Sequence, residues 1–374
     1  MGSRCFWHAE VCPVDPVWPC VPPLHRDELF SSWLIRCALC HACDAVEFAR
    51  WLWPNRRVWT SDIDQAIWSL DLDVLQMKSG IPGDSLMASS LVPLCQYLGL
   101  RCPARSTTPW VLALGGRNLR RAGGLQYCPL CFADEVPFYR QQWRMAWCTC
   151  CPYHRVILHD HCPHCEAVLA PHRLDYRKRN LGCCHQCGGT LAAARTQAAD
   201  KELVVWERRT EAFFHGRKLG LGWPAAPASD AFAFFRELYR LLHIVMNHPS
   251  ANGAGFLTSY GVEARTLSAA DTGLVLECLP VEVRAVYMAA LGKVVAAGEQ
   301  RFIAAVELAR FCPSLRAAVS MPGHSYISQM MPLCSANNKL RAPRGKRSQP
   351  HSPPSVLKAW LRFKRRMLQT GALS

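Results

Sequence analysis

Four short motifs in the middle of the chain each place two metal-ligating side chains three positions apart. The motifs are CPLC, CPYH, CPHC and CHQC, and they supply the pairs Cys128 and Cys131, Cys151 and His154, Cys162 and Cys165, Cys184 and Cys187. A two-residue gap lets both side chains of a tight turn converge on one tetrahedral cation, as in structural zinc sites. The spacing therefore predicts zinc coordination. Three of the four motifs also share a proline after the first cysteine, which indicates an internal repeat.

Four pairs of ligands are enough for two four-coordinate zinc ions. Joined in chain order, the first two pairs form a site of three cysteines and one histidine, and the last two form a four-cysteine site. A cross-braced arrangement, which joins the first pair to the third and the second to the fourth, also fits the spacing. Either arrangement gives each ion four protein ligands and no open position, which favours a structural role over catalysis. We therefore expect removal of zinc to collapse this block.

The stretch CTCCPYH offers more donors than one pair requires. Cys151 and His154 repeat the proline-containing pattern, whereas a pair of Cys148 and Cys151 would lack the proline and leave His154 without a role. The repeat favours Cys151 with His154. We expect Cys148, Cys150 and Cys183 to be bystanders.

Composition indicates the class of protein that contains these motifs. The 374 residues are enough for two or three domains, and a hydrophobic fraction of 50% with 19% charged residues is typical of globular proteins. The N-terminus lacks a signal-peptide core, and no apolar run reaches the roughly 18 residues of a membrane span. We therefore expect a soluble, cytoplasmic protein. Disulfides are rare in the cytoplasm, so we expect the 21 cysteines of the chain to be unpaired and to serve first as metal ligands.

Proline-rich stretches divide the chain into segments. They predict an N-terminal helical domain over 1–120, tandem zinc fingers over 121–197, a C-terminal helical domain over 198–337 and a basic tail over 338–374. In the third segment, helical spacing predicts an amphipathic helix with Ser229 or Asp230 as its N-cap. The apolar face of that helix comprises Phe232, Phe235, Leu238, Leu242 and Val245. The predicted fold class is mainly α with a small α+β zinc-ribbon module.

Other motifs look like chemistry and lack an essential part. CALCH, over residues 37–41, matches a c-type haem attachment motif, but such attachment normally requires export, and small cysteines in an apolar helix are ordinary core residues. Its extension to an iron–sulfur run fails because Glu47 stands near the position of the fourth cysteine. HAE, over residues 8–10, resembles a zinc deaminase motif without the required PCxxC. No nucleotide-binding loop or nucleophile elbow is present, so we expect a protein that is not an enzyme.

The formal net charge of +15 predicts an anionic partner, because Lys and Arg neutralise phosphates in nucleic-acid binding. The stretch 311–374 has many basic residues and no Asp or Glu. Between the halves of the second zinc site, RLDYRKRN supplies candidate DNA contacts, with a solvated loop as the alternative. These contacts are Arg173, Arg177, Lys178 and Arg179.

A helix-turn-helix can be drawn at VLQMKSGIPGDSLMASSL, with Gly80 at the turn. Its second helix would begin beside Asp84 and would carry serines without any Arg or Lys. That surface is poor for phosphate or guanine. The sequence therefore favours a helical unit that contacts protein over one that reads DNA.

Several segments, in this order, resemble a known family. They are PLHRDELFSSWLIRCA over 23–38, SDID over 61–64, the run from LQYCPLC to CPHC over 125–165, and LGCCHQCGGTL over 181–191. The chain is similar to the TniQ/TnsD family of transposition target-selection proteins over about residues 15–195. The resemblance places the family's zinc ligands on the eight positions above. It also implies that the N-terminal, HTH-like TniQ domain is built by Asp27, Glu28, Ser32, Trp33 and Arg36.

The resemblance implies a non-enzymatic adaptor with two zinc ions. Such proteins link a target site on double-stranded DNA to the AAA+ ATPase of a transposon, which then brings the transposase. Some bind the site directly, and others act through a CRISPR effector complex, in some systems as homodimers. For this chain the resemblance implies target-site selection in the cytoplasm, in association with the nucleoid. The target site, the guiding partner and the oligomeric state remain open.

Two other classes of protein share some of these features. A zinc-ribbon transcription regulator would share the charge and the metal, but it should also carry a basic recognition helix. A metalloenzyme acting on nucleic acid would need an open metal site. The ligand count disfavours the enzyme, and the absence of a basic recognition helix disfavours the regulator.

Overall fold

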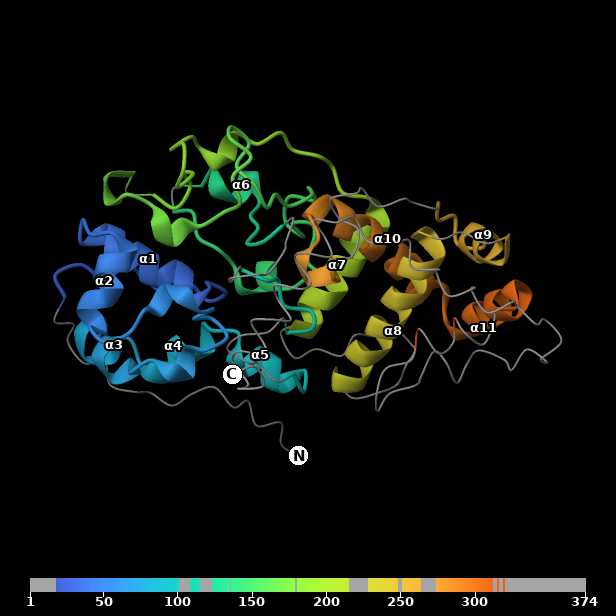
Figure 1. Ribbon diagram of the computed structural model, residues 1–374, viewed down its shortest axis with the longest axis horizontal. Helices are drawn as coiled ribbons and strands as arrows, with labels where there is room; N and C mark the ends of the chain where they lie inside the picture. The colour runs from blue at the N-terminus through green and yellow to red at the C-terminus, as the bar shows by residue number, and fades with distance from the viewer. Residues whose placement is uncertain are drawn as a thin grey trace, which may run out of the picture. The chain divides into compact units, whose positions relative to one another are not determined.

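The computed structural model describes residues 18–100, 108–114, 123–134, 136–178, 180–214, 228–247, 251–263 and 274–311, with the single residues Leu315 and Val319. The chain divides into two compact units, Met1–Pro332 and Leu333–Ser374, and all described residues lie in the first unit. Arg179 and the basic tail over 338–374 lie outside the described residues. Figure 1 labels the helices.

Five helices follow one another in the N-terminal part of the chain (Figure 1). They are α1 (Phe30–Cys40), α2 (Ala45–Leu52), α3 (Leu72–Ser79), α4 (Gly83–Ala88) and α5 (Val92–Tyr97). α1 is apolar over most of its length and buries eight residues, including Trp33. α2 is amphipathic, because its buried residues recur at positions 45, 48, 49 and 52. The side chain of Asp71 caps α3, and Gly80 ends it in the left-handed conformation at φ 71°.

The cysteine-rich segment contains little regular structure. It has one short α-helix, α6 (Pro129–Phe132), and several 3₁₀ turns, including η3 (Gln141–Arg144), η4 (Pro171–Arg173) and η5 (Tyr176–Lys178). Among the described residues, antiparallel pairing occurs as isolated bridges. The expected fold class is confirmed: the described residues are mainly helical with little strand, and two cysteine and histidine clusters could form zinc-binding modules. In place of the expected zinc-ribbon hairpins, the described residues form single antiparallel bridges beside the turns.

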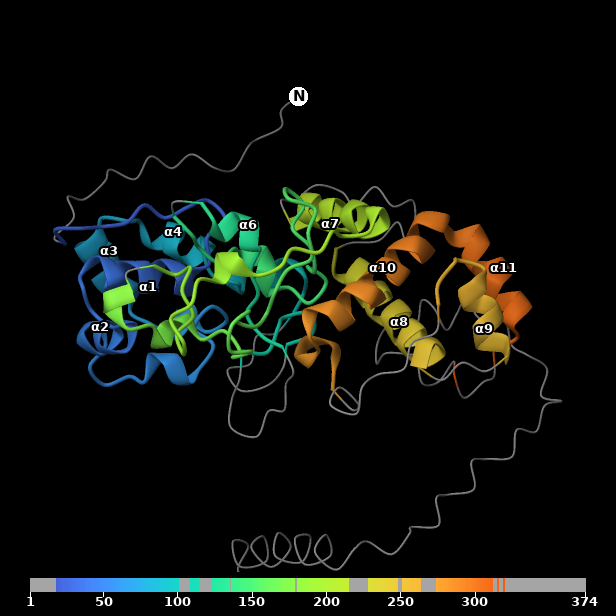
Figure 2. The same ribbon diagram turned by 90° about the horizontal axis from the view of Figure 1, so that it is seen from above.

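In the C-terminal part, the described helices are α7 (Lys201–Phe214), α8 (Ala228–Asn247), α9 (Ala251–Thr258), α10 (Val281–Ala297) and α11 (Glu299–Ala309). α7, α8 and α11 pack against α10, and α9 packs against α8 and α11 (Figure 2). Gly292 permits close approach of α7, because a Cβ there would lie 3.2 Å from the Cβ of Trp206. Among the described residues, no helix combines the length and apolar character of a membrane span.

The predicted amphipathic helix corresponds to α8. All five residues of its predicted apolar face are buried, as expected. The predicted N-cap is wrong, because α8 already begins at Ala228 and includes Ser229 and Asp230 in its first turn. A polar residue near a helix start can lie in the first turn instead of at the cap. An acidic residue in the first turn also interacts favourably with the positive end of the helix dipole.

Candidate metal centres

The first four predicted ligands form one cluster, which we call the first cluster: Cys128, Cys131, Cys151 and His154. Their donor atoms all lie within 4.8 Å of one another. The Sγ atom of Cys131 lies 3.8 Å from Sγ of Cys151 and 3.3 Å from Nδ1 of His154. Nδ1 of His154 is also 3.5 Å from Sγ of Cys128 and 3.6 Å from Sγ of Cys151. Four donors from two turns therefore surround a single point.

The other four predicted ligands form the second cluster: Cys162, Cys165, Cys184 and Cys187. Sγ of Cys162 lies 3.6 Å from Sγ of Cys187, and Sγ of Cys165 lies 3.7 Å from Sγ of Cys184. Both clusters therefore join consecutive pairs in chain order. The structure does not bring the pairs together in the cross-braced arrangement.

The spacing of the donor atoms fits a tetrahedral zinc ion. With zinc–sulfur bonds of about 2.3 Å and zinc–nitrogen bonds of about 2.0 Å, tetrahedral geometry places two sulfurs about 3.8 Å apart and a sulfur and a nitrogen about 3.5 Å apart. The six separations given above, from 3.3 to 3.8 Å, match these edges, and all the donor atoms of each cluster lie within 4.8 Å of one another. Backbone amides also donate to the sulfurs, from His164 to Cys162 at 3.4 Å and from Gln186 to Cys184 at 3.3 Å. Such bonds favour thiolates, the form that binds metal.

Three of the four ligand pairs form the same turn. In each, the amide of the first ligand donates to the carbonyl five residues later at 2.8–2.9 Å, and its carbonyl accepts from the amide four residues later at 2.8–3.0 Å. The residue four positions after the first ligand is left-handed in all three turns, namely Arg155 (φ 54°), Glu166 (φ 57°) and Gly188 (φ 73°). One bridge closes each turn: Cys150 with Ile157, His161 with Val168, and Cys183 with Thr190. The shared backbone conformation therefore joins CPYH, CPHC and CHQC, which is a different set from the three motifs that share a proline.

The remaining pair is held by a helix. Cys128 precedes α6 and Cys131 lies within it, with Pro129 at the first helical position, where its missing amide leaves no bond unmade. The carbonyl of Cys128 accepts the amide of Phe132 at 3.0 Å. One turn of helix also brings residues three positions apart to the same side. The motif CPLC thus reaches the same separation of ligands by a different backbone conformation.

The three expected bystander cysteines lie outside both clusters. Cys148 and Cys150 are buried, and Cys183 is half-buried. The carbonyl of Cys148 accepts bonds from Gln126 at 2.6 Å and from Arg284 at 3.4 Å. In the stretch CTCCPYH, the structure places Cys151 and His154 in the cluster and packs the sulfur of Cys148 into the core.

The N-terminal motif residues fasten the cysteine-rich segment to α1. Arg140, in the spacer of the first cluster, forms an ion pair with Asp27. Ser32 donates to Glu28 at 2.9 Å and accepts the amide of Tyr139 at 3.0 Å. Glu28 is also paired with Arg36 at 2.6 Å. Burial raises the pKa of Glu28 to about 7, against the opposing effect of Arg36.

Trp33 and Arg36 also fix the position of the segment that leads into α1. The indole Nε1 of Trp33 donates to the carbonyl of Pro22 at 3.0 Å, and Nη1 of Arg36 donates to Pro23 at 3.1 Å. Trp33 is itself fully buried. The motif therefore acts through packing and hydrogen bonds inside the protein.

A buried guanidinium makes a second connection between the same two regions. Arg144, on η3, lies between two carboxylates, with Nη1 at 2.9 Å from Asp64 and Nη2 at 2.5 Å from Asp62. Asp64 also accepts the amide and the hydroxyl of Ser31, both at 2.8 Å. Burial raises the pKa of Asp64 to about 6, and Arg144 opposes that shift. The SDID stretch therefore supplies the two carboxylates that bind Arg144.

On its other side the cysteine-rich segment is joined to α10. Arg284 is fully buried and donates to the carbonyl of Ala146 at 2.9 Å and to the side chain of Gln126 at 2.8 Å. Burial lowers the pKa of Arg284. Asp160 accepts the amide of Val281 at 2.8 Å and so caps the first turn of α10. Neither Arg144 nor Arg284 was predicted from the sequence, because the partners of both are distant along the chain.

One expectation about the cysteines is wrong. Cys20 and Cys40 form a disulfide, with their Cα atoms 6.4 Å apart. The expectation from the compartment covered all cysteines alike, whereas, among the cysteines that the structure describes, the fold brings this one pair into bonding geometry. Cys40 belongs to the CALCH stretch, where Cys37 is buried in α1 as expected of a core residue.

The candidate DNA contacts that the structure describes are all exposed. Arg173, on η4, lines a pocket of about 670 Å³, in which the ring of Trp59 stacks on His172. Arg177 lies 4.0 Å from Asp175. Lys178 extends over Gly188, where a Cβ would lie 2.6 Å from its Nζ. Lys178 therefore lies beside the second cluster, and all three cations belong to the stretch of chain between its two ligand pairs.

The helix-turn-helix candidate corresponds to α3 and α4. The turn contains Gly80, and α4 spans only six residues with Asp84 in its first turn. Ser89 and Ser90 are buried, and their hydroxyls bond to the carbonyls of Leu86 and Met87 at 2.7 Å. The serines are therefore part of the packing.

Comparison with known proteins agrees with this geometry. Residues 19–158 match the TniQ family model, which supports classification of the chain with that family. The matched region includes the N-terminal motif, Arg144 and the whole first cluster. No curated protein matches the chain. The chain thus carries a TniQ domain, which fits a protein associated with transposition.

Proposed function

We propose that this chain is a non-enzymatic adaptor for target-site selection in transposition. It would link double-stranded DNA, directly or through a CRISPR effector complex, to the AAA+ ATPase of the transposon and so to the transposase. The observation that carries the proposal is the TniQ match over a region whose polar motif residues bond within the protein. Glu28, Asp62 and Asp64 are engaged with arginines, so they hold the scaffold together.

Two structural zinc ions are part of this proposal. Each cluster supplies four protein donors at tetrahedral spacing, so a bound ion would have closed coordination. Each ion would neutralise the charge of its thiolate ligands and hold together turns that contain almost no regular secondary structure. In this role Cys128, Cys131, Cys151 and His154 hold one ion, and Cys162, Cys165, Cys184 and Cys187 hold the other.

The surface beside the second cluster is our candidate for contact with DNA. Arg173, Arg177 and Lys178 are exposed there, on short 3₁₀ turns between the two halves of that cluster. A metal-held platform positions such cations without the entropy loss of ordering a free loop. Arg179 belongs to the same sequence stretch and to the same proposal. Partners in the transposition machinery and a second copy of the chain would use other faces.

DNA binding by the full-length, zinc-loaded chain tests this surface. We expect weak binding with a log–log salt slope of about −0.9 for each phosphate that the protein neutralises. The variant Arg173→Ala/Arg177→Ala/Lys178→Ala should flatten the slope, and the control Arg56→Ala/Arg57→Ala, which removes exposed cations of the N-terminal part, should leave it unchanged. Equal slopes in both variants would reject the surface.

A second measurement tests the adaptor role itself. In an association assay, the purified chain should bind the AAA+ ATPase of its transposon and retain it on target DNA. No nuclease or deaminase activity is expected. A tight, sequence-selective and salt-insensitive DNA complex without ATPase association would instead indicate a transcription regulator.

A further inference from the structure

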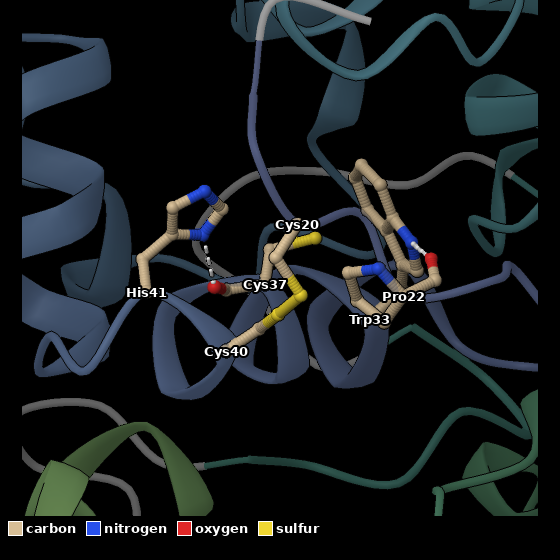
Figure 3. The surroundings of a disulfide bond; sticks show 6 residues. All are labelled: Cys20, Pro22, Trp33, Cys37, Cys40 and His41. Atoms are coloured by element: carbon tan, nitrogen blue, oxygen red, sulfur yellow. Dashed lines mark hydrogen bonds between the residues drawn. A yellow bond between two sulfur atoms is a disulfide. The ribbon is translucent and has the colours of Figure 1, made fainter.

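The disulfide between Cys20 and Cys40 lies on the surface, at the C-terminal end of α1. Both cysteines are exposed, and their Cα separation of 6.4 Å is within the ordinary range of disulfides. Figure 3 shows the bond joining the segment before α1 to the last residue of that helix. A soluble reductant can therefore reach the sulfur atoms without unfolding the domain.

Residues 18–23, which precede α1, also make noncovalent contacts with the helices. The amide of Trp18 donates to the carbonyl of Lys78 at 2.9 Å, and the ring of Trp18 packs on His41 and Phe48. Beyond the disulfide, the carbonyl of Pro22 accepts the indole of Trp33 (Figure 3). Between Trp18 and Pro22, the disulfide attaches the chain covalently to α1.

A third cysteine lies next to the disulfide and stays reduced. Cys37 precedes Cys40 by one helical turn, on the same side of α1, and its thiol is buried. Burial raises the pKa of Cys37 well above its usual value. The thiol is therefore protonated and a poor nucleophile. Opening of the disulfide must then come from a reductant outside the protein.

The same segment forms one wall of a pocket. A pocket of about 470 Å³ is lined by Pro22, Arg36 and Cys40 on one side, and by Pro137 and Leu181 of the cysteine-rich segment on the other. Displacement of the segment around Cys20 would widen this pocket. The disulfide therefore lies at a pocket between α1 and the segment that carries both clusters, because Cys40 lines it.

We infer that Cys20 and Cys40 form a reducible clasp that sets how tightly residues 18–23 dock on α1. The thiolate of a dithiol reductant attacks one sulfur, the disulfide bond breaks, and a mixed disulfide forms while the other cysteine leaves as a thiolate. The second thiol of the reductant then attacks the mixed disulfide. The reductant departs as a disulfide, and the protein holds two thiols after uptake of two electrons and two protons. This inference does not depend on the proposed function.

The test compares the full-length, zinc-loaded chain before and after treatment with thioredoxin or dithiothreitol. Before reduction, alkylation followed by mass spectrometry should leave Cys20 and Cys40 unmodified, and after reduction both should be labelled. Hydrogen exchange of the Trp18 amide should become about tenfold faster on reduction, because the chain is no longer closed by a covalent link. Zinc content, measured in parallel, should not change.

Two variants separate the clasp from a general effect of the reductant. Cys20→Ser/Cys40→Ser should exchange as fast as the reduced protein and should not respond to reductant. Cys43→Ser removes a nearby thiol outside the disulfide and should behave like the unaltered chain. The inference is overturned if Cys20 and Cys40 are alkylated in air-oxidised protein, or if exchange at Trp18 is the same in both redox states.

Discussion

The cysteine-rich segment over 123–200 and the helices α7 to α11 keep their shapes by different means. The described part of the segment has one short α-helix and otherwise turns, and its donor atoms gather in two clusters. Both regions contribute buried side chains to the apolar core, but the helices contribute whole faces, and α10 has buried residues on all sides of its axis. In the first region we expect metal affinity to add to stability, because its two clusters could bind zinc, whereas the second relies on apolar area removed from water.

The two regions are nevertheless joined by buried polar contacts. Arg284 extends from α10 into the cysteine-rich segment, and Asp160 extends from that segment to the first turn of α10. Glu277, just before α10, also accepts the amide of Trp110, which precedes the cysteine-rich segment, at 2.7 Å and pairs with Arg236 of α8. A difference in the source of stability therefore does not make the regions independent.

Loss of one metal ligand should have the largest effect and should be confined at first to the cysteine-rich segment. We expect Cys184→Ser to lower the zinc content from two ions per chain to one, because the second cluster loses one of its four ligands. The effect on stability should be large, since apparent binding free energies of zinc in small modules are about 10–16 kcal/mol. Metal analysis and limited proteolysis measure this. Cys183→Ser changes the adjacent, non-clustered cysteine and should keep both ions. Equal zinc loss in the two variants would contradict the assignment.

Arg284→Met tests the junction between the regions. The substitution removes a buried donor from several carbonyls and should lower the free energy of unfolding by about 3 kcal/mol. Chemical denaturation followed by fluorescence measures it. Arg301→Met, on an exposed face of α11, is the matched control and should cost under about 1 kcal/mol. A small effect at Arg284 would mean that the regions pack without this interaction.

Glu28 gives the attachment to α1 a pH dependence. Because burial raises its pKa from 4.5 to about 7, the folded state binds this proton more tightly than the unfolded state. Stability from this group is therefore present below pH 4.5 and is lost as pH rises through 7, by up to about 1.4 kcal/mol per pH unit. Unfolding measured from pH 5 to pH 8 should show the decline in the unaltered chain.

The variant Glu28→Gln isolates that dependence. Its difference in unfolding free energy from the unaltered chain should change with pH in this window, whereas Glu47→Gln, on the exposed side of α2, should give a constant difference. Protonation of the cluster ligands affects all three proteins alike and cancels. A constant difference for Glu28→Gln would contradict the shifted pKa.

The smallest effects should distinguish the three equivalent turns. Gly188→Ala places a Cβ on a left-handed residue and should cost about 1 kcal/mol. Arg155→Gly relieves the same strain in another turn and should stabilise the protein by up to about 1 kcal/mol. Thermal unfolding at constant zinc content measures both. Effects of the same sign would mean that the turns are not equivalent.

Much of the candidate site could be predicted from sequence because it is local. Ligands three positions apart must share a turn, so Cys162 and Cys165 or Cys184 and Cys187 were recognisable as pairs. The left-handed residue after the second ligand was not recognisable, because glycine occupies only one of three such positions, and Arg155 and Glu166 occupy the others. The apolar face of α8 followed from helical periodicity for the same local reason.

Contacts between distant residues could not be predicted in this way. Arg144 and Arg284 look like ordinary surface cations in the sequence, yet both are fully buried. The disulfide between Cys20 and Cys40 contradicts the expectation from compartment, since spacing alone does not bring those cysteines together. The N-cap of α8 failed because several polar residues near a helix start compete for that position.

The sequence alone determined the donor set: eight ligands in four pairs, and the order of motifs that resembles the TniQ/TnsD family. Tertiary structure decided which pairs join, how the clusters attach to α1 and α10, and which cysteines bond to each other. The reason is physical. A turn of a few residues is governed by its own backbone geometry, whereas contacts between distant segments depend on how the whole core packs.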